Sequence, residues 1–135
     1  MINAFQKNAY QRYQYNSVMS ASPQQLLIML LDGAIKFVRL GREDIKQKDM
    51  EGAHYNLSKA QDIVMELDES LDMDYDISQS LSGIYEFIYR QLIEANIKKD
   101  IKTLDQVELF LCDLKDTWVE ALKTARKAEV QYGGK

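Results

Sequence analysis

Apolar residues recur at alternating spacings of three and four along most of the chain, and this period predicts amphipathic helices. The clearest row contains Met50, Ala53, Leu57, Ala60, Val64, Leu67 and Leu71. Similar rows follow Pro23, Asp76 and Asp100, so the chain divides into four predicted helices of roughly 20 to 28 residues. Each of these helices has an apolar face that must be buried against its neighbours.

The inward faces of the other three helices are assigned from the same period. On the first helix, expected from Pro23 to about Gln47, the central row is Leu27, Leu30, Ala34, Val38, Gly41 and Ile45. On the third helix the row is Ile77, Leu81, Ile84, Ile88 and Ala95. On the fourth helix it is Leu104, Val107, Leu111, Leu114, Trp118, Leu122 and Ala125.

Helix starts are marked by residues that cap free backbone N–H groups. Ser22, Pro23 and Gln25 form a capping-box pattern with proline in the first turn. Asp49 and Asp100 have the capping role before the second and fourth helices. The connections are only a few residues long, which favours antiparallel neighbours. We therefore predict an all-α fold, an antiparallel up-down-up-down four-helix bundle preceded by a short, movable N-terminal segment.

The bundle is predicted to be a single domain over residues 1–135. Residues 1–21 form an aromatic N-terminal segment, residues 22–130 the bundle and residues 131–135 a frayed tail. The N-terminal segment is marginal as an isolated helix, so its order must come from docking. We hypothesise that residues 1–18 cover apolar surface and move when a partner binds. Binding of this segment to a membrane surface is the weaker alternative, because little positive charge accompanies its apolar face.

Composition narrows the function. The net charge is -4 and the pI about 5.0, so no nucleic-acid partner is expected. The longest apolar run, residues 26–31, is far shorter than the roughly 20 residues that cross a bilayer, so no direct membrane insertion is expected. The N-terminus lacks the pattern of a secretory signal, which favours a cytoplasmic location.

No catalytic or metal-binding constellation is evident. Residues 72–76 imitate the start of a calcium loop, but Ile77 and Gly83 stand where that loop needs glycine and glutamate. Glu51 and His54 have the spacing of a di-iron ligand pair, but such a site needs a second histidine and His54 is alone. We therefore predict a non-enzyme without cofactor or metal ion, with a metal oxidase as a remote alternative.

Some apolar residues are predicted to lie away from the core. At 100° per residue, Tyr89, Ile93 and Ile97 lie opposite the inward row of the third helix, and Leu109 is opposed in the same way on the fourth. Single exposed apolar residues are common on monomers, so an ordinary surface role for these side chains has about the same weight as a functional one. The functional alternative is a set of grooves for a partner's amphipathic helices. Met29 suits such a surface because its unbranched side chain repacks easily, although it could equally fill the core.

Four segments, taken in order, resemble the FliS family of bacterial flagellar secretion chaperones. They are "AYQRYQYNSVMSASPQQLLIMLLDGAIKF" (9–37), "NLSKAQDIVMELDESLD" (56–72), "IYEFIYRQLIEANIKKD" (84–100) and "LKDTWVEALKTA" (114–125). The resemblance implies a cytoplasmic bundle that binds the disordered C-terminal region of flagellin one to one, prevents premature polymerisation and keeps flagellin competent for export. It also implies a second partner, the cytoplasmic domain of the export-gate membrane protein. The alternative is a helical-bundle adaptor or regulator of another flagellar or secretion protein.

The resemblance adds particular positions. Tyr10 and Tyr13 match the family's aromatic N-terminal positions, and Val18 matches the pattern before the first helix. Trp118 matches the family tryptophan, for which a core role is favoured over client contact. Departures from the family pattern question single contacts rather than the fold, and they lie at Leu31, Gln91 and Lys115. The predicted partner-binding residues are Tyr10, Tyr13, Val18, Met29, Tyr89, Ile93, Ile97 and Leu109.

Overall fold

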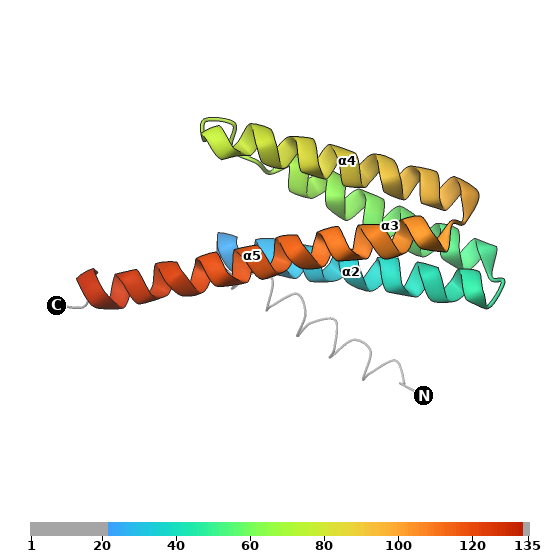
Figure 1. Ribbon diagram of the computed structural model, residues 1–135, viewed down its shortest axis with the longest axis horizontal. Coiled ribbons are helices and arrows are strands. Elements are labelled where there is room, and N and C mark those ends of the chain that lie inside the picture. The colour runs from blue at the N-terminus through green and yellow to red at the C-terminus, as the bar shows by residue number, and fades with distance from the viewer. Residues whose placement is uncertain (1–21, 134–135) are drawn as a thin grey trace, which may run out of the picture.

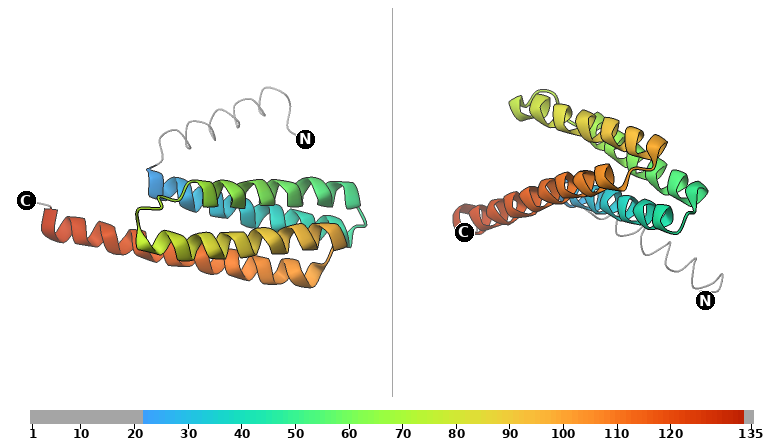
Figure 2. Two further views of the ribbon diagram at one scale, coloured as in Figure 1. Left: turned by 90° about the horizontal axis from the view of Figure 1, so that it is seen from above. Right: turned by 45° about the vertical axis from the view of Figure 1, so that its right-hand side comes forward.

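The computed structural model describes residues 22–133, with side chains described up to Ala125 and at Lys127. It contains the helices α2 (Pro23–Lys46), α3 (Met50–Glu69), α4 (Asp76–Lys98) and α5 (Ile101–Gly133). Successive helices run in opposite directions (Figure 1). Each packs against the next, and α5 returns to pack against α2 (Figure 2). The predicted all-α, up-down-up-down four-helix bundle is confirmed.

The core receives apolar side chains from all four helices. On α3 and the first half of α5, the buried residues follow the predicted rows. On α2 the row is buried from Ala34 onward, whereas Leu27 and Leu30 are partly buried and the flanking Leu31 and Ile35 are buried instead. Examples with no exposed surface are Val38, Leu57 and Leu111. Trp118 is partly buried against this core, as favoured from the sequence. At the row ends the prediction was wrong for Met50 and Ala125, which are exposed because the neighbouring helices do not cover them.

The inward face of α4 is rotated from the predicted one. Ile77 and Ile84, predicted to be inward, are exposed, whereas Tyr85 is fully buried. Tyr89, predicted to lie opposite the core, is partly buried against it. The helix carries apolar residues around much of its circumference, so a row through Tyr85 has the same period as a row through Ile84. The larger ring gains more from burial, which favours the observed rotation.

Local capping chemistry follows the prediction. Ser22 and Gln25 form both hydrogen bonds of a capping box, and Asp49 Oδ1 accepts from the Gly52 N–H at 2.9 Å. Asp100 Oδ1 accepts from the Lys102 N–H at 3.0 Å at the start of α5. Helix α5 continues to Gly133, so residues 131–133, expected in a frayed tail, are helical.

Charged side chains tie α2 to α5. Arg39 Nε lies 2.6 Å from Glu108 Oε2, and Arg42 also contacts Glu108, at 2.5 Å. Lys115 Nζ lies 2.6 Å from Asp32 Oδ1 farther along the same contact. Among the described side chains, no ion pair or hydrogen bond joins α4 to α5. Ordinary apolar contacts therefore hold that side of the bundle together.

Candidate functional site

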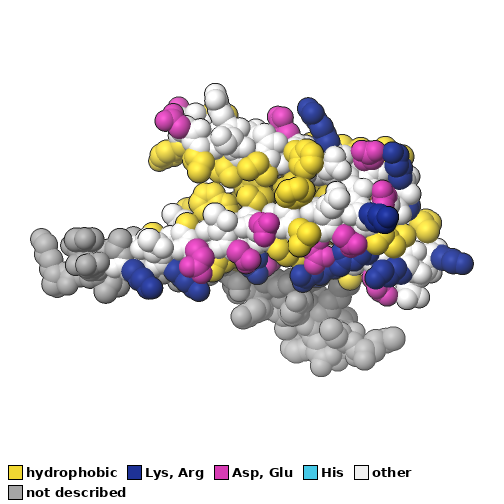
Figure 3. All heavy atoms as spheres, viewed as in Figure 1, with side chains coloured by type: hydrophobic (Ala, Val, Ile, Leu, Met, Phe, Trp, Pro, Cys, Tyr) yellow, Lys and Arg dark blue, Asp and Glu magenta, His cyan; other side chains and the backbone are white. Residues whose placement is uncertain are grey.

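An apolar groove opens between α4 and α5. The two helices lie near each other at the Asp100 turn and diverge away from it (Figures 1 and 2). Hydrophobic side chains gather between them on the face shown in Figure 3. The groove contains a pocket of about 440 Å³ lined by Ser80, Gly83, Ile84, Phe87, Phe110, Asp113, Leu114 and Thr117.

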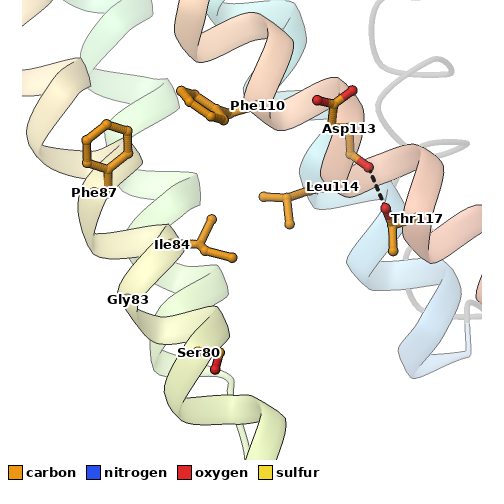
Figure 4. Close-up of a pocket in the computed structure, with 8 residues that line it drawn as sticks. All are labelled: Ser80, Gly83, Ile84, Phe87, Phe110, Asp113, Leu114 and Thr117. Atoms are coloured by element: carbon orange, nitrogen blue, oxygen red, sulfur yellow. Dashed lines mark hydrogen bonds between the residues drawn. The ribbon is translucent and has the colours of Figure 1, made fainter.

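The walls of the groove carry large apolar side chains that remain exposed. Ile84, Phe87 and Phe110 have 40%, 46% and 44% of their surface exposed. Leu114 is partly buried and connects the groove to the core. Phe87 from α4 and Phe110 from α5 form an edge-to-face contact across the groove. These side chains come from both helices, so a ligand in the groove would contact both at once (Figure 4).

Polar groups in the groove are few. The Thr117 hydroxyl donates to the Asp113 backbone oxygen at 2.9 Å, so this donor is already used within α5 (Figure 4). The Asp113 carboxylate and the Ser80 hydroxyl are the other side-chain polar groups of the lining. A site of this kind favours an apolar ligand and contains no set of groups for covalent or acid–base chemistry.

A second depression lies between the start of α2 and the later part of α5. It is lined by Ser22, Gln24, Gln25, Trp118, Ala121, Leu122 and Ala125, with a volume of about 440 Å³. Three of these residues are polar and two are alanines, so a larger share of its lining is polar than in the groove. Trp118 forms one wall of this depression while also packing on the core.

The predicted partner-binding residues are spread over the molecule. Tyr10, Tyr13 and Val18 lie outside the described residues. Ile97 and Leu109 are 77% and 66% exposed, consistent with a surface position. The remaining three are less exposed. Met29 is 36% exposed, Ile93 is half-buried, and Tyr89 packs on the core.

None of the described members of that set lines the groove. Sequence reasoning missed Phe87 and Phe110, because neither falls on the inward row of its helix. One signal was available: Ile84 and Phe87 are spaced by three, and Phe110 and Leu114 by four. Each pair therefore shares one helix flank.

His54, the residue considered as a metal ligand, lies beside Asn96 of α4. His54 is exposed, and its Nδ1 lies 3.4 Å from Asn96 Oδ1. Across the described part of the chain, no three His, Cys, Asp or Glu side chains are arranged to hold a metal ion. No described helix is long and apolar enough to cross a membrane.

Comparisons with known proteins identify the family. The family model described as "Flagellar protein FliS" matches residues 6–125. A flagellar secretion chaperone FliS from Bacillus subtilis is 41% identical, covering 95% of this chain and 96% of the relative. The chaperone of the same name from Escherichia coli is 33% identical, covering 79% and 81%.

A solved structure agrees with the sequence relatives. A bacterial flagellar chaperone has a TM-score of 0.72 and 28% identity, with 87% of this chain and 98% of that chain covered. The matching proteins are chaperones and not enzymes, which confirms the predicted non-enzyme and the predicted role in flagellar export. The chain belongs to the FliS family of flagellar secretion chaperones.

Proposed function

We propose that this chain is a cytoplasmic chaperone for flagellin. It binds the disordered C-terminal region of flagellin one to one, prevents premature polymerisation and keeps the subunit competent for export. The observation that carries the proposal is the exposed apolar groove with the Phe87–Phe110 pair. An amphipathic client helix places its apolar face in such a groove and keeps its polar face in water.

The groove alone is too small to account for tight binding. Full burial of a large apolar side chain contributes about 1.5–3 kcal/mol, and Ile84, Phe87 and Phe110 are already more than half buried. Their further burial contributes roughly 1 kcal/mol each, whereas micromolar affinity requires about 8 kcal/mol. An extended client that also contacts other surfaces supplies the difference.

The additional surfaces are proposed from the sequence-based set. Ile97 and Leu109 are exposed apolar side chains on α4 and α5 outside the groove. We propose them as further client contacts, together with Met29, Tyr89, Ile93 and the N-terminal Tyr10, Tyr13 and Val18. Of these, Tyr89 acts through its remaining exposed edge, because the rest of its ring packs on the core.

A second proposed partner is the cytoplasmic domain of the export-gate membrane protein. Binding to that domain brings the chaperone–client complex to the export machinery without insertion of this chain into the membrane. The alternative function is an adaptor for another flagellar or secretion protein. Co-purification from cells distinguishes these functions, because the chaperone proposal requires flagellin as the dominant bound species.

Calorimetry with two forms of flagellin tests the proposed function. Intact flagellin should bind at a ratio of one to one, and flagellin truncated at its C-terminus should show no measurable heat of binding. Size-exclusion chromatography of the same mixtures should show a complex only with the intact protein. Equal binding of both forms would contradict the proposed mode.

A further inference from the structure

Four glycines lie within α2, α3 and α4, although glycine destabilises a helix interior relative to alanine. At three of them a side chain would meet a neighbour. A Cβ atom at Gly41 would lie 2.6 Å from Leu57 Cδ2, and one at Gly33 would lie 3.3 Å from Ile63 Cδ1. At Gly52 it would meet the capping carboxylate of Asp49. Packing or capping therefore explains each of these three glycines.

Gly83 on α4 has no such explanation. A Cβ atom there would have no heavy atom within 4 Å. Its backbone does not require glycine either, since no described glycine has a positive φ. Gly83 lines the groove beside Ser80 and Ile84 (Figure 4). The open space above it is therefore part of the groove.

We propose that Gly83 sets the depth of the groove and thereby selects the client helix. The helix of the C-terminal flagellin region packs directly on the backbone of α4 at Gly83, and its apolar side chains reach Phe87 and Phe110. This inference rests on the proposed function, because it names the residue at which that client is recognised.

The size and chemistry of the groove favour one face of an apolar or basic helix as the occupant. A volume of about 440 Å³ accommodates several side chains but not an entire helix, so one face of a helix enters. Helices approach to 8–10 Å between axes according to the side chains at the contact, and glycine allows the nearer approach. The rim includes Asp113, and residues 60–89 contain carboxylates but no Lys or Arg. The entering face is therefore apolar or basic rather than acidic.

Substitution of Gly83 should change stability and binding in opposite directions. Gly83→Ala should raise the melting temperature by about 4 °C, because alanine favours the helix and meets open space. The same change should weaken binding of intact flagellin about 5-fold, and Gly83→Leu about 50-fold, because overpacking opposes the close approach. Lys59→Leu, at an exposed α3 position that does not line the groove, is the control and should leave binding within about two-fold.

The outcomes separate this inference from the proposed function. If wild-type protein binds flagellin and Gly83→Leu binds it equally well, Gly83 does not select the client, although the proposed function stands. If wild-type protein binds no flagellin, both proposals are wrong. A lower melting temperature for Gly83→Ala would contradict the open space above Gly83. If Gly83→Leu instead converted a dimer of the free protein into a monomer, the occupant would be a second copy of the chain.

Discussion

Phe87 of α4 and Phe110 of α5 meet edge to face, with ring centroids 5.6 Å apart and ring planes at 89°. Edge-to-face aromatic pairs contribute about 0.5–1.5 kcal/mol beyond the area they bury. Both rings also remain partly exposed in the groove. They therefore help to hold α4 beside α5 and at the same time present apolar surface to a client.

Removal of either ring should weaken client binding more than it affects folding. Phe87→Ala and Phe110→Ala should each reduce the affinity for intact flagellin about 10-fold in calorimetry, a loss of about 1.4 kcal/mol. Far-ultraviolet circular dichroism should be nearly unchanged. Tyr55→Ala is the control, because Tyr55 is an exposed aromatic residue on α3 that does not line the groove. An equal loss of affinity in that variant would mean that the groove is not the principal contact.

Gly41→Ala should destabilise the bundle although alanine is the better helix former. The added methyl group would lie 2.6 Å from Leu57 Cδ2, and Leu57 is fully buried and has little room to move. Overpacking costs about 1–3 kcal/mol, which exceeds the roughly 1 kcal/mol gained in helix propensity. Urea unfolding should therefore show a lower midpoint.

A double-mutant cycle tests whether the destabilisation comes from the contact between residue 41 and Leu57. Leu57→Ala alone should cost about 2–5 kcal/mol through the cavity that it leaves. In the Gly41→Ala background the same change should cost less, because it also relieves the clash. Additive effects would show that the Gly41 methyl group is accommodated elsewhere.

The Glu108 ion pairs should make stability depend on acid pH. Burial of Glu108 opposes its ionisation, but hydrogen bonds from Arg39 and Arg42 outweigh burial and hold the pKa of Glu108 below its ordinary value. Because the folded pKa is the lower one, this stabilisation is complete above the unfolded pKa of about 4.3 and is lost as pH falls through the folded pKa. Glu108→Gln should lower the free energy of unfolding by about 1 kcal/mol at pH 7.

Urea unfolding between pH 7 and pH 3 checks this expectation. The difference between wild type and Glu108→Gln should shrink below about pH 4. Glu86→Gln changes an exposed carboxylate on α4 and should alter stability by less than about 0.5 kcal/mol at any of these pH values. A constant difference between wild type and Glu108→Gln would mean that the lost stability does not come from the charge of Glu108.

Tyr85→Phe should leave the protein equally stable or more stable. The ring is fully buried, and the Tyr85 hydroxyl has no hydrogen-bond partner among the described residues. Burial is the main reason that the pKa of this hydroxyl is raised. Removing an unpaired buried hydroxyl should gain up to about 1 kcal/mol of unfolding free energy in urea. A loss of more than about 1 kcal/mol would reveal a bound partner, such as a water molecule.

Local chemistry made much of the fold predictable. Ser22, Asp49 and Asp100 cap helices through atoms only a few residues away, so sequence spacing was sufficient. The face of α3 was predictable because polar residues flank its apolar row. The face of α4 was not, because Ile84, Tyr85 and Phe87 allow several rows with the same period. Only packing against α3 and α5 selects the one with Tyr85 inside.

The groove depends on a property that no single helix contains. Phe87 and Phe110 lie on different helices, on either side of the connection between α4 and α5. Their contact requires a particular angle between these two helices (Figure 1). Sequence period predicts which residues share a flank of one helix but not the angle between two helices. By contrast, the exposed positions of Ile97 and Leu109 were predictable, because exposure of each depends only on the face of its own helix.

The interactions between α5 and α2 differ from those between α5 and α4. Arg39, Arg42 and Lys115 form ion pairs across the α2 side, whereas the α4 side relies on apolar contact. Ionic strength acts differently on the two, because the screening length falls from about 8 Å at physiological salt to about 3 Å at 1 M, whereas excluded salts strengthen apolar burial. Concentrated sulfate should therefore weaken the ion pairs between α2 and α5, while it strengthens the apolar packing of the bundle and the apolar contact of a client in the groove.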